Sequence, residues 1–233
     1  MSQFPETAIV TGGEGGIGRA IRTLLESEGC AVRSLDLLND FDVTDPAAWD
    51  DVEAADLACL NAGILTENAD PLEMTPEQYR RAVAVNVDGV VLGVRALARV
   101  LEPGSTIVAT ASLAGLIPME SDPVYSLTKH AVVGFVRSVA PALAQRGITI
   151  NLVCPGLADT PMVDSAREAL EAAGFPLIDP AKVAEAVLLA ARSGETGKAW
   201  AIQPGREPVD FRFPNVPGPR IEGAEGLLPP LSR

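Results

Sequence analysis

The sequence is poor in the residues that build disulfide frameworks and metal centres. Its 233 residues include only three cysteines and one histidine. Cys30, Cys59 and Cys154 are odd in number, far apart and set among strand-forming residues, which indicates neither disulfide pairing nor the CxxC spacing of a zinc site. His130 has no thiols or carboxylates clustered around it in the sequence, and one histidine alone does not make a zinc site. We therefore expect buried, inert thiols and no metal.

Basic charge and long apolar runs are also scarce. The 18 lysines and arginines are outnumbered by 31 acidic residues, and the net charge is -13. Such a surface repels a nucleic-acid backbone and anionic lipid headgroups alike. Apolar runs such as 83–87 and 187–191 fall well short of the roughly 20 residues that span a bilayer, and no charged leader precedes a cleavage-like site. We expect a soluble, cytoplasmic protein that binds neither nucleic acid nor membrane.

What the sequence does contain is a regular alternation of short apolar runs and helical patterns. This alternation is typical of a parallel sheet whose strands are joined by crossover helices. It predicts an α/β fold with a doubly wound, Rossmann-like parallel sheet of about seven strands, in a single domain over residues 1–203. The expected strands are 7–11, 31–35, 40–43, 57–61, 106–110, 149–153 and 199–202. The expected helices are 16–28, 46–52, 75–101, 124–145 and 180–193.

Two places depart from a regular pattern. Only a few residues separate the expected strands 31–35 and 40–43, whereas parallel neighbours need a connection of about a dozen residues or more. Either the third strand is vestigial or the loop is unusual, so the fold is shortened between strands two and three. Pro141 lies inside the expected helix 124–145, where it removes one backbone hydrogen bond and should kink or shorten the helix near its end.

The chain changes character after Gln203. Seven prolines fall within 203–233, and the phenylalanines and leucines there follow no period. We interpret 204–233 as an irregular, proline-rich C-terminal tail. It is either disordered or laid over the domain or a neighbouring subunit, and Phe211 and Phe213 favour the second interpretation.

A glycine turn follows the first expected strand and opens the first expected helix. Glycine lets the backbone adopt positive φ and approach a ligand closely, and the free N–H groups and dipole of a helix start suit a pyrophosphate. A purely steric tight turn is the alternative, but the position between strand and helix favours a dinucleotide site. The turn consists of Gly12, Gly13, Glu14, Gly15, Gly16, Ile17 and Gly18.

Asp36 ends the second expected strand, about 20 residues beyond the glycines, where an acidic residue binds the ribose hydroxyls of NAD. A carboxylate there repels the additional phosphate of NADP, and neither Leu37 nor Glu14 supplies a compensating cation. NAD is therefore the expected cofactor. Taken alone, Asp36 is better explained as a solvent-facing residue at a strand end, and it is the glycine turn that reverses this in favour of the cofactor interpretation.

Tyr125 and Lys129 are four residues apart at the start of an expected helix, so both lie on one face. A phenol with an ordinary pKa near 10 is too weak a base at neutral pH, and a nearby ammonium lowers that pKa. Ser112 follows the strand 106–110 at the carboxyl edge of the sheet, where open α/β proteins bind ligands. A chance YxxxK on an amphipathic helix and a turn serine are the plain alternatives.

With these residues in place, the chain resembles the short-chain dehydrogenase/reductase family over roughly residues 5–203. The shared TGxxxGxG motif consists of Thr11, Gly12, Gly16 and Gly18. The family's catalytic tetrad matches Asn86, Ser112, Tyr125 and Lys129 in order and spacing. The remaining matches are the NAG motif Asn61, Ala62 and Gly63 and the PG motif Pro155 and Gly156, followed by Thr160. The stretch 125–163 is similar to hydroxyprostaglandin-dehydrogenase-like members, and the shortened segment is similar to bacterial hydroxysteroid dehydrogenases.

The resemblance implies a role for each matching residue. Tyr125 would act as the base, Lys129 would lower its pKa and bind the nicotinamide ribose, and Ser112 would hydrogen-bond the substrate oxygen. Asn86 would position a water that links Lys129 to solvent, and Asn61 would stabilise the central sheet. The cofactor-binding residues implied are Gly12, Glu14, Gly15, Gly16, Ile17, Gly18, Asp36, Asp42, Val43, Asn61, Ala62, Gly63, Tyr125, Lys129, Pro155, Gly156, Leu157 and Thr160, with Asp42 and Val43 at the adenine.

These patterns predict an NAD-dependent oxidoreductase that acts on a small, largely apolar secondary alcohol or ketone. The substrate side is indicated by apolar residues, which serve equally well as core: Leu113, Leu116, Ile117, Met119, Val124, Met162, Val163, Leu170 and Phe175. A non-catalytic NAD-binding regulator is one alternative. A sugar-nucleotide epimerase or dehydratase is another, although those resemble longer chains. By family resemblance we expect a homodimer or homotetramer.

Overall fold

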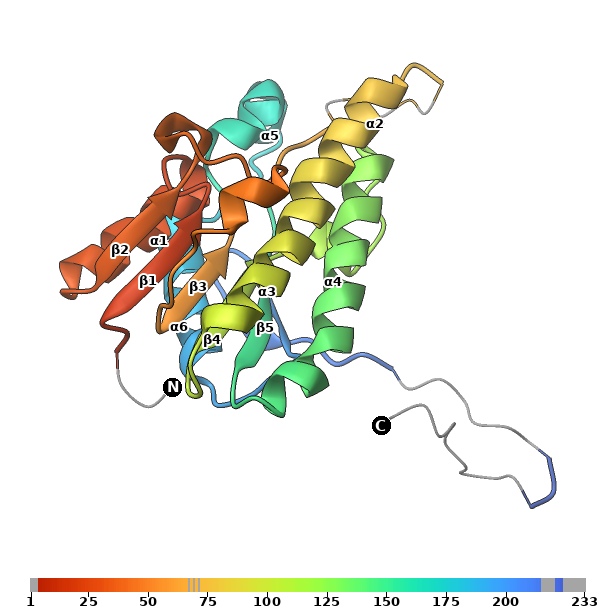
Figure 1. Cartoon of the computed structure of the whole chain (residues 1–233). Helices are drawn as coiled ribbons and strands as arrows, with labels where there is room; N and C mark the ends of the chain where they lie inside the picture. The colour runs from red at the N-terminus through yellow and green to blue at the C-terminus, as the bar shows by residue number, and fades with distance from the viewer. Residues whose placement is uncertain (1–3, 67, 69, 71, 215–220, 224–233) are drawn as a thin grey trace.

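Six parallel strands and one short antiparallel strand form the central sheet, in the order β2-β1-β3-β4-β5-β6-β7 (Figure 1). The computed structural model describes residues 4–66, 68, 70, 72–214 and 221–223. The strands are β1 (Thr7–Thr11), β2 (Ala31–Leu35), β3 (Leu57–Leu60), β4 (Thr106–Thr110), β5 (Thr149–Pro155), β6 (Ala199–Ile202) and β7 (Val209–Asp210). β1 lies between β2 and β3, so the connection from β1 to β2 and the connection from β2 to β3 run in opposite directions across the sheet. Ligands of open α/β sheets bind at such a switch point.

Helices cover both faces of the sheet, which makes the predicted doubly wound α/β architecture correct (Figure 1). On one face, α1 (Gly16–Ser27) and α6 (Pro180–Arg192) enclose an apolar core against the strands. On the other, α3 (Gly89–Val100) and α4 (Pro123–Ala144) enclose a second core. The central strands β1, β3, β4 and β5 are buried from both sides, which explains why they read as apolar runs without polar alternation.

The expected strand 40–43 is wrong. Residues 37–39 form a short 3-10 turn, and Asp40 adopts a left-handed φ of 59° that ends it. The expected helix 46–52 is also wrong in type, because the structure has a single 3-10 turn at Pro46–Trp49. The buried Trp49 packs edge-on against Phe41 at 5.0 Å and donates a hydrogen bond from Nε1 to the carbonyl of Val43 at 3.1 Å. The segment between β2 and β3 is thus held by the packing of Phe41 on Trp49 and not by a strand and a helix.

The expected helix 75–101 is three successive elements, α2 (Pro76–Val83), the π-helical turn η3 (Ala84–Asp88) and α3. Thr75 and Gln78 form a reciprocal capping box at its start, as the polar first turn predicts. The π-helical turn carries Asn86. Sequence periodicity also misses α5 (Arg167–Ala172), which lies above the carboxyl ends of the strands. The helix α4 continues through Pro141 to Ala144, so the proline falls in its last turns.

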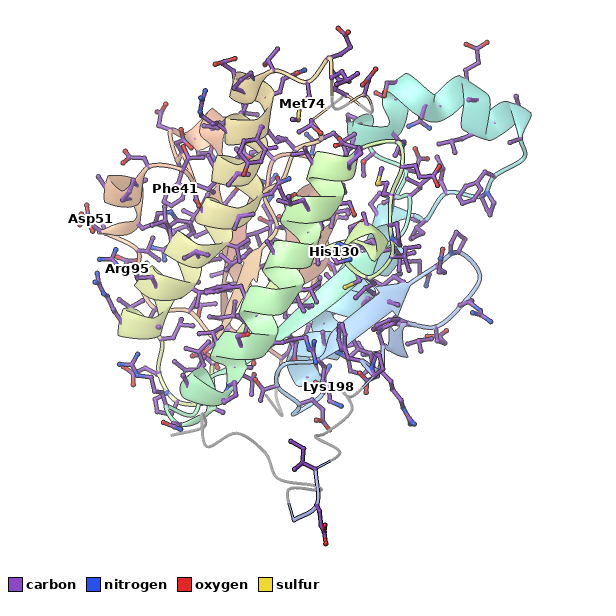
Figure 2. All side chains as sticks on the ribbon, turned by 90° about the vertical axis from the view of Figure 1, so that its right-hand side faces the viewer. Phe41, Asp51, Met74, Arg95, His130 and Lys198 are labelled. Atoms are coloured by element: carbon purple, nitrogen blue, oxygen red, sulfur yellow. The ribbon has the colours of Figure 1, made fainter. Side chains whose placement is uncertain are left out.

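The first part of the tail lies against the domain. β7 pairs antiparallel with β6, and Lys198, labelled in Figure 2, forms an ion pair with Asp210 at 3.1 Å. Phe211 and Phe213 pack against the core on the α4 side, and the guanidinium of Arg137 lies 3.6 Å from the Phe213 ring centroid. The seventh strand therefore comes from the tail instead of from 40–43. Leu227 and Leu228 lie outside the described residues.

All three cysteines are free and buried, as expected from the sequence. His130 is exposed on α4 (Figure 2), with Nδ1 2.9 Å from the carbonyl of Ser126. Among the described residues, no three histidine, cysteine or acidic side chains gather as metal ligands do. In the same part of the chain, every helix is too short or too polar to cross a bilayer.

Candidate active site

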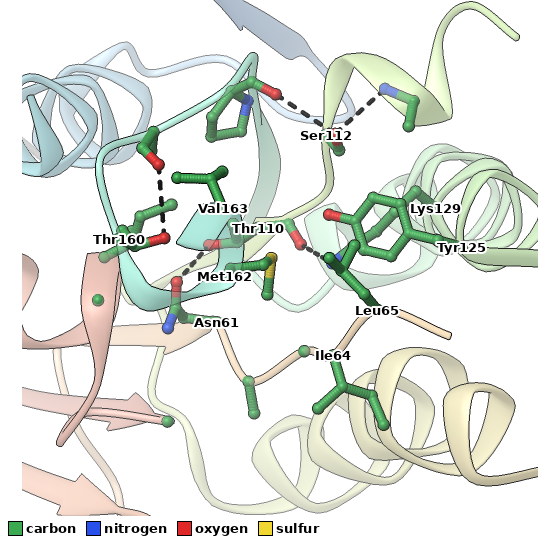
Figure 3. A pocket seen from close by; sticks show the side chains of 18 of the residues that line it. Asn61, Ile64, Leu65, Thr110, Ser112, Tyr125, Lys129, Thr160, Met162 and Val163 are labelled. Atoms are coloured by element: carbon green, nitrogen blue, oxygen red, sulfur yellow. Dashed lines mark hydrogen bonds between the residues drawn. The ribbon is translucent and has the colours of Figure 1, made fainter. Parts of the chain in front are cut away.

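A cavity of about 1510 Å³ opens at the carboxyl ends of the parallel strands and collects most of the predicted site residues (Figure 3). Those that line it are Gly12, Gly15, Gly16, Ile17, Asp36, Asp42, Val43, Asn61, Ala62, Gly63, Ser112, Tyr125, Lys129, Pro155, Gly156, Leu157 and Thr160. Glu14, Gly18 and Asn86 are not in the lining. Of the expected apolar residues, Leu116 and Val124 are absent from it, while the other seven are present.

The glycine turn brings the backbone of β1 close to the loop after β3. Gly12 adopts a φ of +63°, and a Cβ there would lie 3.0 Å from the Cα of Ala62. A Cβ on Gly18 would lie 2.0 Å from the carbonyl oxygen of Gly12, so Gly18 serves the packing of α1 against the turn. α1 begins at Gly16 with no side-chain cap, which leaves its first N–H groups for a ligand. This cradle fits the pyrophosphate of a dinucleotide.

Asn61 connects three neighbouring strands at the centre of the cavity. Its backbone N–H donates to Oγ1 of Thr11 at 2.8 Å, and its Nδ2 donates to the carbonyl of Thr11 at 3.3 Å. The hydroxyl of Thr110 donates to Oδ1 of Asn61 at 3.1 Å. These bonds fix the loop Asn61, Ala62 and Gly63 relative to β1 and β4. The sequence assigned Asn61 to the sheet and Thr11 to the glycine motif, but it did not reveal that both bond to each other or that Thr110 joins them, because these partners are far apart along the chain.

The carboxylate of Asp36 stands at the end of β2, where it lines the cavity. Its two oxygens accept N–H bonds from Glu14 and Leu38, both at 3.1 Å. The side chain of Glu14 is held outside the lining, since it forms an ion pair with Arg22 and accepts from Asn39 at 3.2 Å. The neighbouring Ser34, opposed by partial desolvation, is the largest influence that lowers the pKa of Glu14. The residues of the glycine turn therefore bring no unpaired positive charge to the end of the cavity where Asp36 lies.

Ser112, Tyr125 and Lys129 meet at the other end of the cavity, as Figure 3 shows. The hydroxyl of Ser112 accepts from the N–H of Ala114 at 3.1 Å and donates to the carbonyl of Pro155 at 3.3 Å. The ammonium of Lys129 donates to the carbonyl of Thr110 at 2.9 Å and lies 5.5 Å from the ring centroid of Tyr125. The phenol of Tyr125 and the ammonium of Lys129, which are one turn apart on α4, therefore face the same part of the cavity.

Asn86 is fully buried beside this group. Its Nδ2 donates to the carbonyl of Ile64 at 2.8 Å and to Oγ1 of Thr128 at 3.0 Å, while its Oδ1 accepts from the N–H of Ile64 at 2.8 Å. A Cβ on Gly63 would lie 3.2 Å from Nζ of Lys129 and 3.3 Å from Oδ1 of Asn86. Gly63 thus allows Asn86 and Lys129 to approach each other.

Burial dominates the electrostatics of Tyr125 and Lys129. Desolvation raises the pKa of Tyr125 to about 12, although a hydrogen bond with Ser112 acts in the opposite direction. Desolvation also lowers the pKa of Lys129 to about 8. In the protein alone, desolvation outweighs the charges around the phenol, and the ammonium of Lys129 is itself buried and bonded to Thr110. The expectation that Lys129 lowers the tyrosine pKa stays a prediction for the complex with cofactor. A further positive charge is needed to favour the phenolate.

The depressed pKa of Lys129 predicts a pH-dependent stability difference between the wild type and Lys129→Met. Between pH 8 and 10.5 the folded lysine is mostly neutral while the unfolded one is still charged, so the unfolded state binds more protons. The stability of the wild type relative to the variant should rise across this window, by up to about 1.4 kcal/mol per pH unit, and stay flat below it. Urea denaturation at several pH values measures this. Parallel pH profiles of the two proteins would contradict it.

Asp122 is a buried site residue that sequence reasoning missed. It caps α4 by accepting the N–H of Tyr125 at 2.9 Å, and it also accepts the N–H of Thr66 at 2.8 Å and the Thr66 hydroxyl. It therefore ties the loop after β3 to the first turn of the helix that carries Tyr125. An Asp-Pro pair immediately before a helical pattern was the available signal, since aspartate favours the N-cap and proline the first helical position.

Comparisons with known proteins agree with this geometry. Residues 13–194 match a family model described as enoyl-(acyl carrier protein) reductase. A cis-4-hydroxycyclohexanecarboxylate dehydrogenase of Sinomonas cyclohexanicum is 35% identical over 84% of this chain and 92% of its own length. A 3-alpha-(or 20-beta)-hydroxysteroid dehydrogenase of Mycobacterium tuberculosis is 30% identical over 86% and 88%. The ligand-free aldohexose dehydrogenase of Thermoplasma acidophilum superposes with a TM-score of 0.77 at 25% identity, over 89% and 97%. The chain belongs to the short-chain dehydrogenase/reductase family of oxidoreductases.

Proposed function

We propose that the chain is an NAD-dependent dehydrogenase that oxidises a largely apolar secondary alcohol to its ketone and catalyses the reverse reaction. The observation that carries this proposal is the meeting of Ser112, Tyr125 and Lys129 at one end of a cavity whose other end presents Asp36 and the glycine turn. Alcohols of ring compounds appear in the names of two relatives, a hydroxycyclohexanecarboxylate and a hydroxysteroid dehydrogenase. A secondary alcohol on a saturated ring is the substrate class we favour.

In this proposal, Ser112 and Tyr125 bind the substrate hydroxyl through their own hydroxyl groups. The phenolate of Tyr125 accepts the hydroxyl proton at Oη, and the ammonium of Lys129 supplies part of the positive charge that favours this phenolate. Bound NAD supplies the ring that takes hydride from the carbinol carbon and the further positive charge beside the phenol. One alcohol and one NAD thus give one ketone, one NADH and one proton. Asn86 acts through Ile64 and Thr128, which position the loop after β3 and α4.

The apolar lining supports the substrate class. Leu113, Met119 and Met162 lie on the same cavity as the proposed base and present no hydrogen-bonding group to a substrate skeleton. A screen of secondary alcohols with NAD, followed by the absorbance of NADH, tests the proposal directly. Failure of every cyclic and acyclic secondary alcohol, with NAD bound, would favour the alternative of a non-catalytic NAD-binding regulator.

Cofactor choice is tested by Asp36→Ala. The carboxylate of Asp36 is held by two backbone N–H groups at the end of β2, where it is placed to accept the ribose hydroxyls and to repel an added phosphate. Its removal should weaken NAD binding by about tenfold to a hundredfold and improve NADP binding, as hydrogen bonds to a charged group contribute about 1.5–3 kcal/mol. Calorimetric titration with each dinucleotide gives both numbers. Unchanged affinities would exclude Asp36 from the ribose site.

A further inference from the structure

One cation in the cavity lining remains unengaged. The charged residues of the lining are Asp36, Asp42, Arg81, Asp122 and Lys129. The three aspartates accept hydrogen bonds from the chain, and Lys129 donates one to Thr110. Arg81 is exposed, and it alone among these five has neither a hydrogen bond nor an ion pair with any residue in the described part of the chain. Its neighbour Arg80, in contrast, pairs with Glu77 at 3.0 Å and does not line the cavity.

Helical spacing directs Arg81 to the cavity. Arg81, Ala84 and Val85 occupy one face of α2 and its π-helical continuation, and all three line the cavity. Arg81 precedes the buried Asn86 by five residues, which is about 7.5 Å along a helix axis. It therefore stands near the rim, while Asn86 stands at the depth of Lys129. In Figure 1, α2 and α5 lie on separate sides above the carboxyl ends of the strands.

The lining between this rim and the proposed base is apolar. Ile64 and Leu65, from the loop after β3, and Met162, from the segment after β5, line the same cavity as Tyr125 (Figure 3). These side chains can contact a hydrocarbon skeleton but cannot bind a charged group. A ligand that touches both ends of this part of the cavity needs an oxygen at Tyr125, an apolar middle and an anion at Arg81.

We propose that Arg81 binds a carboxylate of the substrate, so that the substrate is a hydroxy acid whose carboxylate and reacting carbon are separated by an apolar skeleton. This inference rests on the proposed dehydrogenase function. The planar guanidinium matches a carboxylate with two parallel hydrogen bonds. A phosphate dianion would call for a second cation, and the other cation of the lining, Lys129, is buried and bonded to Thr110. With a net charge of -13, the protein otherwise repels an anionic substrate, and Arg81 offsets that repulsion locally.

The test compares an acid with its neutral counterpart. The probes are 4-hydroxycyclohexanecarboxylate and its primary amide, each oxidised by the wild type, by Arg81→Gln and by the matched control Arg80→Gln. Arg81→Gln should lower kcat/KM for the acid by about tenfold to a hundredfold, mainly through KM, because it removes charge-assisted hydrogen bonds. The amide should react equally with all three proteins. Arg80→Gln should leave both substrates unchanged.

Binding of 4-oxocyclohexanecarboxylate, measured by calorimetry with NADH present, separates the two proposals. Binding that depends on Arg81 without turnover of either alcohol would overturn the dehydrogenase function and keep the anion site. Equal turnover of acid and amide in the wild type and in Arg81→Gln would keep the function and overturn the anion site. The anion site is also overturned if Arg81→Gln changes neither turnover nor binding of the acid relative to the amide.

Discussion

Replacement of Tyr125 by phenylalanine should lower NADH-forming turnover of a secondary alcohol by about 10²- to 10⁴-fold, the usual contribution of a general base. The ring of Tyr125 is buried and its N–H is held by Asp122, so phenylalanine fills the same space and keeps the same backbone position. What the variant loses is the oxygen that accepts the substrate proton. The loss should appear in kcat and in kcat/KM together, because the missing interaction belongs to the transition state.

Calorimetric titration with NAD is the control for this variant. The glycine turn and Asp36 lie at the far end of the cavity and do not contact Tyr125 through any hydrogen bond in the described residues. NAD affinity should therefore change little. Turnover equal to that of the wild type would exclude Tyr125 as the base. Equal loss of turnover and NAD binding would mean that the substitution disturbs the whole cavity and that Tyr125 has a mainly structural role.

Local pattern predicted most of the sheet because its central strands β1, β3, β4 and β5 are short apolar runs buried from both sides. β1, β2, β4 and β6 begin and end at the predicted residues, and β3 differs by one residue. The segment 40–43 failed for a non-local reason. Its apolar residues Phe41 and Val43 contact Trp49 rather than a neighbouring strand, and no periodicity within four residues reveals which partner an apolar side chain will find.

The predicted helix 75–101 is helical from Pro76 to Val100, but its sequence did not reveal the π-helical turn inside it. A π-helical turn inserts one residue into a helix without changing its composition, so the apolar period of 75–101 runs through the irregularity at Asn86. The residues that line the cavity from distant elements were also hidden. Arg81 reads as one of two adjacent basic residues in the last turn of α2, and only the fold shows that Arg80 meets Glu77 while Arg81 meets the cavity.

The glycine turn was recognised from its spacing, yet its members serve different purposes. Gly12 and Gly16 line the cavity with positive φ. Gly18 does not line it and instead lets α1 pack against the carbonyl of Gly12. Glu14 likewise turns away from the lining to pair with Arg22. The motif therefore identified a turn that lies at the cavity, but it did not distinguish the residues that line the cavity from those whose packing holds the turn in shape.

Gly18→Ala tests that distinction and should destabilise the protein by about 1–3 kcal/mol or more, the range typical of overpacked cores. The expected sign is opposite to helix propensity, because alanine in a helix interior is favoured over glycine by about 1 kcal/mol. The added Cβ would lie 2.0 Å from the carbonyl oxygen of Gly12 and 2.8 Å from Nδ2 of Asn61. Neither can move without displacing the turn or the network that joins β1, β3 and β4.

Gly134→Ala is the matched control for this substitution. Gly134 also lies in a helix interior, in α4, but a Cβ there meets nothing within 4 Å. Helix propensity acts alone at this position, so this variant should gain up to about 1 kcal/mol. Urea denaturation measures both changes, and NAD titration should show weaker binding for Gly18→Ala only. If Gly18→Ala gained stability as Gly134→Ala does, the turn would be able to shift without cost, and the shape of the proposed pyrophosphate cradle would not depend on the close contact between Gly18 and Gly12.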